Sequence, residues 1–96
     1  MAFALTAKWT AKAGEEEAVL AAIRSLIEPS RAEPGCRFYQ ANRDAEDPCV
    51  FLFYEIYDDE AAYVAHGASD HFRQFGHGVA IPLLENRERQ FLQTID

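Results

Sequence analysis

The chain has 96 residues, 49% of them hydrophobic, and its 16 acidic residues against 9 basic ones give a formal net charge of −7. This length corresponds to one domain, residues 1–96, and the negative charge argues against nucleic acid or an anionic membrane as a partner, fitting a small neutral or weakly acidic ligand better. Because no apolar run approaches the roughly 18 residues of a membrane span, and the N-terminus lacks the basic start of a signal peptide, we expect a cytoplasmic protein.

The first third of the sequence predicts a strand followed by an amphipathic helix. Apolar residues alternate between Phe3 and Thr10, as in a strand with one buried face. Three glutamates from Glu15 onward suit the positive end of a helix, and apolar residues then recur at helical spacing: Val19, Leu20, Ile23, Leu26 and Ile27. Because Pro29 and Pro34 each restrict the preceding residue away from helical geometry, we expect this helix to end between residues 27 and 31.

Two further strands, 36–43 and 49–57, are predicted around an acidic turn that ends at Pro48. The second strand is apolar throughout except for Glu55, so both of its faces should be buried. Two helices can cover one face of a small sheet. The economical cover for the other face is the same sheet of a second copy, which predicts an isologous homodimer.

The segment 54–75 gathers two histidines, three tyrosines and two phenylalanines around one junction between a strand and a helix. The strand should lead into a helix over roughly residues 59–65, with Asp58 or Asp59 as the N-cap. Gly67 then ends this helix just after His66, and a second short helix follows. We expect this aromatic and titratable segment to carry the function.

After that segment, Gly76-His77-Gly78 is expected to be a flexible joint, followed by an apolar stretch interrupted by Pro82 and a last strand from Asn86. The order of elements is then strand, helix, strand, strand, helix, strand. Four antiparallel strands with crossover helices on one face form a ferredoxin-like, split βαβ arrangement of the α+β class.

Neither the cysteines nor the histidines form a recognised metal motif. Cys36 and Cys49 fall at opposite ends of the predicted hairpin, so we expect two free thiols, as in a reducing compartment. His66, His71 and His77 are five and six residues apart and do not share one helical face. We therefore expect no metal site.

The sequence reads Ser30-Arg31-x-Glu33-Pro34-Gly35-Cys36-x-x-Tyr39, then Arg43-Asp44 and Asp47-Pro48, then Phe53-Tyr54-Glu55-x-Tyr57-x-Asp59-x-x-Ala62-x-x-x-His66-x-x-Ser69-x-His71-Phe72. In combination these residues resemble the antibiotic biosynthesis monooxygenase (ABM) domain family, and its small quinol-monooxygenase-like members in particular. The resemblance implies a dimeric α+β barrel, in which the sheets of two subunits pack on each other and each subunit has a pocket. Two positions depart from the family: Tyr57 replaces the usual Trp, and Asp70 replaces a frequent Pro.

The resemblance also implies a cofactor-independent monooxygenase that oxidises a small aromatic quinol or phenol with dioxygen. Such a site needs a base near neutral pH, a dry apolar cavity and a donor for the developing oxyanion. His66 is the first candidate for the base and His71 the second, because an imidazole titrates near pH ~6.5. Tyr54 and Tyr57 are the candidate donors. The candidate substrate-binding residues are Trp9, Arg31, Phe53, Phe72 and Phe75.

Other interpretations stay open. His66 could serve to cap a helix end, Arg31 could form an ion pair with Glu33, and Glu55 could pair with Arg31 or Arg37 or act as a base. A dimer of this kind could also sequester a ligand without turnover, or act as an isomerase or signal-degrading enzyme. The same fold also serves haem-degrading enzymes, in which a histidine ligates iron and an asparagine in the first strand assists. Residues 3–10 contain no asparagine, which disfavours this interpretation.

Overall fold

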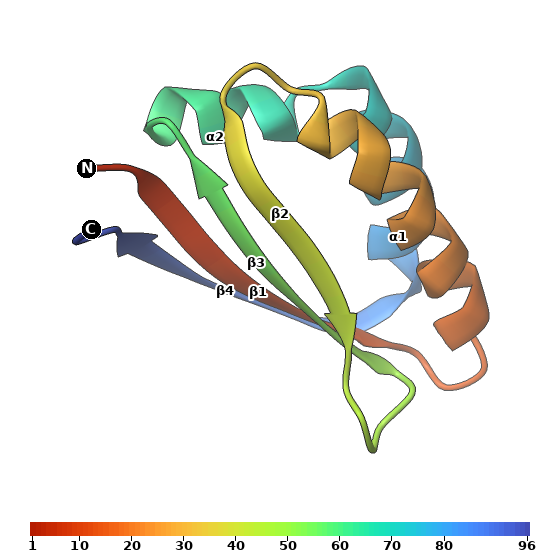
Figure 1. Cartoon of the computed structure of the whole chain (residues 1–96). Coiled ribbons are helices and arrows are strands. Elements are labelled where there is room, and N and C mark those ends of the chain that lie inside the picture. Colours follow the sequence, from red (N-terminus) through yellow and green to blue (C-terminus); the bar gives the residue numbers. More distant parts are fainter.

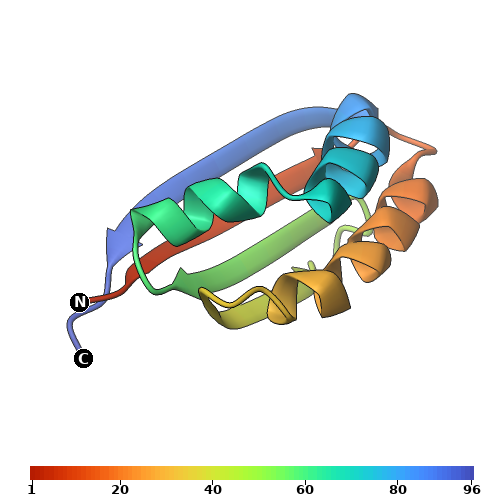
Figure 2. The same cartoon turned by 90° about the horizontal axis from the view of Figure 1, so that it is seen from above.

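The computed structural model describes all 96 residues and contains one sheet of four antiparallel strands in the order β2-β3-β1-β4. Figure 1 shows the helices on one side of this sheet, and the view from above in Figure 2 shows them lying across it. This is the predicted ferredoxin-like α+β fold. The elements are β1 (Phe3–Ala11), helix α1 (Glu16–Arg31), β2 (Cys36–Arg43), β3 (Val50–Tyr57), helix α2 (Glu60–Gly67), the π-helix η1 (Phe72–Ala80), the 3₁₀ turn η2 (Ile81–Leu83) and β4 (Leu84–Gln93).

The register of the sheet fixes which residues face the helices. β1 lies between β3 and β4, so its residues 3–10 each have a partner on both sides. Because side chains alternate along a strand, every second row points to the same face. The rows on the helix side are Glu55–Leu5–Phe91, Phe53–Ala7–Arg89 and Phe51–Trp9–Arg87.

The apolar stripe of α1 supplies the core, as its spacing predicts. Val19, Ile23 and Leu26 are buried and pack with residues from the helix face of the sheet, including Trp9 and Phe53. Both cysteines are free, which confirms the prediction from their positions in the hairpin. None of the helices is both long and apolar enough to span a membrane.

Helix α1 ends at Arg31, within the predicted range of residues 27–31, and Pro29 lies in its last turn, where a proline removes a single backbone hydrogen bond while the buried Ser30 keeps the turn packed on the core. Two other local predictions were wrong. The predicted flexible joint at residues 76–78 is part of η1. Gly76 packs directly against Phe72, since a Cβ added there would lie 3.1 Å from the Phe72 ring. β4 also begins two residues earlier than predicted, at Leu84.

The second face of β3 is open in the single chain. Leu52 is 38% exposed and Tyr54 37% exposed, and Phe38 of β2, whose ring lies 5.8 Å from that of Tyr54, is 44% exposed. Within one subunit the helices cover one face of β3 only, as predicted, because all of them lie on the other side of the sheet. A second copy as the cover of this face stays a prediction.

Candidate active site

A cavity of about 390 Å³ lies between the sheet and the helices α2 and η1. Its floor comes from β1 and β3, β4 forms one side, and α2 and η1 cover it. Both aromatic and titratable side chains line the cavity. The lining residues are Leu5, Ala7, Trp9, Tyr39, Phe53, Glu55, Tyr63, Val64, His66, Gly67, Phe72, His77, Arg87 and Arg89.

His66 lies in the last turn of α2 and faces this cavity. Asp59 begins the helix as its N-cap and accepts a hydrogen bond of 2.9 Å from the backbone N–H of Ala62, as the sequence predicts. His66 is only 3% exposed, and its imidazole lies beside the rings of Tyr57, at 5.5 Å between centroids, and Phe72, at 5.1 Å. The imidazole is thus held in an apolar wall with little room to rotate.

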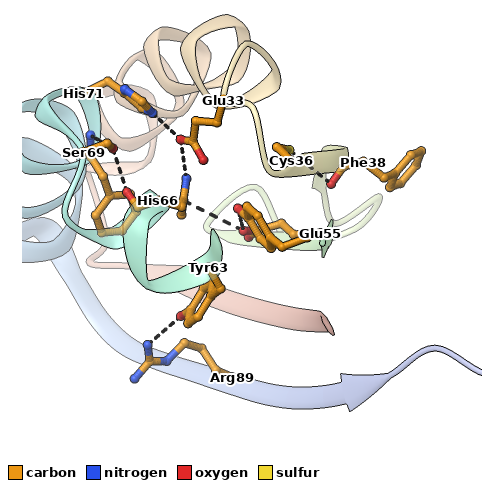
Figure 3. A network of polar contacts seen from close by, with 11 residues as sticks. Glu33, Cys36, Phe38, Glu55, Tyr63, His66, Ser69, His71 and Arg89 are labelled. Atoms are coloured by element: carbon orange, nitrogen blue, oxygen red, sulfur yellow. Dashed lines mark hydrogen bonds and ion pairs between the residues drawn. The ribbon is translucent and has the colours of Figure 1, made fainter. Parts of the chain in front are cut away.

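Glu33 joins His66 to His71 (Figure 3). Its Oε2 lies 2.8 Å from His66 Nδ1 and 2.5 Å from His71 Nε2. An ionised carboxylate only accepts hydrogen bonds, so both imidazoles donate to it. His66 then carries its proton on Nδ1, which leaves Nε2 as the basic nitrogen of the neutral ring.

The turn between α1 and β2 places Glu33 beneath α2. The Cys36 N–H bonds the Glu33 carbonyl at 3.1 Å, closing a turn over Pro34 and Gly35, and the Asp58 N–H bonds the Gly35 carbonyl at 2.9 Å. A Cβ at Gly35 would lie 2.5 Å from the Cβ of Ala62 in α2. A side chain at residue 35 would therefore push α2, and with it His66, away from Glu33.

Glu55 lies on the other side of His66 and is 6% exposed. Tyr57 donates a hydrogen bond of 2.6 Å to Glu55 Oε1, which is 3.9 Å from His66 Nε2. Burial raises the pKa of Glu55, and burial together with this neighbouring carboxyl raises the pKa of Tyr57. His66 Nε2 is therefore beyond hydrogen-bond distance from Glu55 and stays available to a guest in the cavity.

The side of the cavity at β4 is basic. Arg89 donates a hydrogen bond of 2.9 Å to the Tyr63 hydroxyl of α2 (Figure 3). Arg87 lies beside Trp9 in the sheet, and its Nε is buried without a hydrogen-bond partner. Burial and the nearby Arg89 lower the pKa of Arg87.

Four of the predicted site residues line the cavity, namely Trp9, Phe53, His66 and Phe72. The others lie elsewhere. Tyr57 and His71 bond the carboxylates on either side of His66, and Phe75 packs against the hydrophobic core. Arg31 donates to the Tyr39 carbonyl at 3.0 Å, and Tyr54 lies on the open face of the sheet.

Three suggested pairings were wrong. Arg31 pairs with Glu28 and with neither Glu33 nor Glu55, and Arg37 pairs with Asp58 instead of Glu55. His66 and His71 share no helical face, as their spacing predicts, but the spacing did not reveal that the fold brings them together. The chain bends after Gly67, where α2 ends, so these two rings lie 6.1 Å apart.

The sequence interpretation kept Glu55 only as an alternative and missed Arg87 and Arg89, although all three carried a signal. Glu55 is the one charged residue of an apolar strand. It lies two residues from Phe53 and from Tyr57, and therefore on the same, buried face of the strand. Arg87 and Arg89 alternate in the last strand in the same way. Glu33 carried no comparable signal, because its partners are 33 and 38 residues away in the sequence.

Glu33, His66 and His71 are also the one group whose ligand atoms, all within 4.8 Å of one another, suit a metal ion. Two imidazoles and one carboxylate are a donor set found for zinc and iron. The contacts of 2.8 and 2.5 Å are hydrogen-bond distances, so the three side chains as arranged form a hydrogen-bonded triad.

Comparisons with known proteins give a consistent result. The family model for antibiotic biosynthesis monooxygenase matches residues 2–77. The chain is similar to PA3566 from Pseudomonas aeruginosa, whose crystal structure matches with a TM-score of 0.91 and 35% sequence identity. The match covers 99% of this chain and 95% of the PA3566 chain. A crystal structure described as an antibiotic biosynthesis monooxygenase is 26% identical with a TM-score of 0.89, covering 98% and 99%. An uncharacterised protein of Synechocystis sp. is 36% identical over 64 residues, which are 67% of this chain and 44% of that protein, so the chain spans less than half of this relative.

Proposed function

Since the chain belongs to the antibiotic biosynthesis monooxygenase family, we propose that it is a cofactor-independent monooxygenase that oxidises a small aromatic quinol or phenol with dioxygen. The observation that carries the proposal is His66, whose Nδ1 is bonded to Glu33 while its Nε2 is free beside an aromatic cavity. This is the arrangement of a general base oriented by a carboxylate.

The first step is removal of a phenolic proton by His66 Nε2. Dioxygen has a triplet ground state, so the substrate has to supply one electron at a time, and an ionised quinol is a far better donor than a neutral one. The Glu33 carboxylate stabilises the imidazolium that forms, as the carboxylate does in a catalytic triad. The buried wall keeps water away from the reacting pair and strengthens these interactions.

The later steps balance without a further reductant. One electron passes from the quinolate to dioxygen, and the resulting superoxide and semiquinone combine by forming a carbon–oxygen bond. The imidazolium returns its proton to the peroxide oxygen, and the hydroperoxide then loses water: its oxygen–oxygen bond and the C–H bond at the same carbon both break, and the proton released from carbon leaves with the hydroxide. For a naphthohydroquinone the sum is C₁₀H₈O₂ plus O₂, giving the hydroxyquinone C₁₀H₆O₃ plus water.

We expect the active form to be a homodimer formed through the open face of the sheet. Phe38, Leu52 and Tyr54 are the exposed apolar residues there, and a second sheet would cover them. Sedimentation at micromolar concentration should give twice the mass of 10.8 kDa. A monomer at this concentration would contradict the expectation.

The oxygenase proposal is tested by oxygen uptake with a panel of naphthalenic and benzenoid hydroquinones. We expect His66→Ala to lower kcat/KM by about 10²–10⁴-fold, the usual contribution of a general base. His77→Ala is the matched control, because His77 also lines the cavity but contacts Phe72 and has no acidic partner. It should lower kcat/KM by less than about tenfold.

Uptake no faster than autoxidation across the whole panel would contradict the oxygenase. Trp9, the one tryptophan of the chain, lines the cavity, so its fluorescence reports binding independently of turnover. Saturable quenching of Trp9 by a quinol, without oxygen uptake, would favour a protein that binds such ligands without converting them.

A further inference from the structure

We propose that Arg87 and Arg89 form a subsite for an anionic group, and that the natural substrate is an acidic aromatic such as a hydroxylated aromatic carboxylate. The inference rests on the proposed function in that the same cavity holds the substrate. It adds the charge of the substrate and the direction in which it binds.

The cavity is basic within an acidic protein. The chain has a formal net charge of −7, yet two arginines line the cavity against the single carboxyl of Glu55. Neither arginine forms an ion pair. By contrast, Arg31, Arg37, Arg43 and Arg73 each pair with an acidic side chain on the surface. Arg24 also lacks an ion pair, but it is exposed on α1, whereas Arg87 and Arg89 line the cavity without a carboxylate partner.

Arg87 leaves donors unused. Its Nε is buried and has no partner, and the structure contains no hydrogen bond from any of its nitrogens. A guanidinium has five N–H donors, and leaving such groups unpaired away from water costs free energy. Arg89 uses one N–H on the neutral Tyr63 hydroxyl and lies over the Phe91 ring. A bound carboxylate would satisfy the free donors and offset the two positive charges.

The two arginines lie across the sheet from the base. His66 sits over Glu55 of β3, whereas Arg87 and Arg89 project from β4, on the far side of β1. Trp9, Phe53 and Phe72 line the space between these two sides. An aromatic guest with an anionic group toward β4 would then present a hydroxyl toward His66. Binding of the acid would thus orient the ring for proton removal.

The experiment compares 2-naphthoate with 2-naphthamide, which have the same ring and nearly the same shape but differ in charge. Neither is a quinol, so neither consumes oxygen. Their affinities are measured by quenching of Trp9 fluorescence and by calorimetry. We expect native protein to bind the acid at least tenfold more tightly than the amide, the scale of one hydrogen bond to a charged group.

Arg87→Gln should remove most of this preference by weakening binding of the acid roughly tenfold to a hundredfold, with little effect on the amide. Arg89→Gln, on the exposed rim, should reduce the preference without disturbing buried packing. Arg24→Gln is the matched control, because Arg24 is exposed on α1 and carries the same charge. It should leave both affinities unchanged.

Equal affinity for the two probes, or an equal loss for both in Arg87→Gln and Arg89→Gln, would overturn the subsite. The result is separable from the oxygenase proposal. Oxygen uptake that is as fast with 1,4-dihydroxynaphthalene as with 1,4-dihydroxy-2-naphthoate would keep the oxygenase and overturn the subsite. A preference for 2-naphthoate over 2-naphthamide, without uptake of oxygen with either quinol, would keep the subsite and overturn the oxygenase.

Discussion

Removing the Glu33 carboxylate should weaken the fold and the site together. Glu33 and His66 are largely buried, with side chains 14% and 4% exposed, whereas His71 is 19% exposed. In Glu33→Ala the His66 Nδ1–H loses its acceptor in a buried position, at a cost of about 1–3 kcal/mol. His71 reaches water more easily and adds about 1 kcal/mol. We expect a total loss of about 3 kcal/mol from a stability of order 5–15 kcal/mol.

The measurement is urea denaturation followed by circular dichroism, analysed by linear extrapolation. A loss of about 3 kcal/mol corresponds to a fall in Tm of roughly 12–24 °C for a chain of this size. Glu33→Gln keeps one acceptor oxygen and should lose about half as much. Glu28→Ala is the control, because its side chain is 86% exposed and a surface ion pair of this kind contributes about 0–1 kcal/mol.

A double-mutant cycle with His66→Ala isolates the pair, and we expect a coupling free energy of about 1–2 kcal/mol. Glu33 acts as a positioning residue, so Glu33→Gln should lower kcat for quinol oxidation with little change in KM. Coupling below about 0.5 kcal/mol, with kcat unchanged in Glu33→Gln, would refute the assignment of Glu33 as the group that orients His66.

Two further predictions concern stability. Gly35→Ala places a Cβ 2.5 Å from the Cβ of Ala62 and should lower the free energy of unfolding by about 1–3 kcal/mol in urea denaturation. Gly67→Ala, whose Cβ would have nothing within 4 Å, should be neutral or stabilising by up to about 1 kcal/mol, and equal effects of the two variants would contradict the close approach at Gly35. Because burial raises the pKa of Glu55, the folded state binds a proton that the unfolded chain has released, so native stability falls as pH rises above the ordinary glutamate pKa. Glu55→Gln cannot ionise and should gain stability relative to native protein over that range, in unfolding curves at a series of pH values; a difference independent of pH would show that Glu55 ionises normally.

The sequence by itself determined the elements and the fold class. Periodicity of two or 3.6 residues records which side of each segment is buried, so the strands and the stripe of α1 were predictable without partners. The cap at Asp59 and the end of α2 after His66 follow from interactions within a few residues. The alternation of side chains along β3 also predicts that Tyr54 faces the opposite side of the sheet from Phe53 and Tyr57, since neighbours in a strand face opposite sides.

Only the tertiary structure decided the composition of the site. Glu33 meets His66 because the turn at Gly35 docks on α2, and Arg87 meets Trp9 because β4 pairs with β1 from the other end of the chain. These contacts depend on sheet order and register. No local pattern encodes them, because the free energy that fixes the register is spread over the whole core. The tertiary structure therefore replaced a cluster of neighbours in sequence with a candidate base, two carboxyls and a basic wall drawn from α2, β3, β4 and the turn before β2.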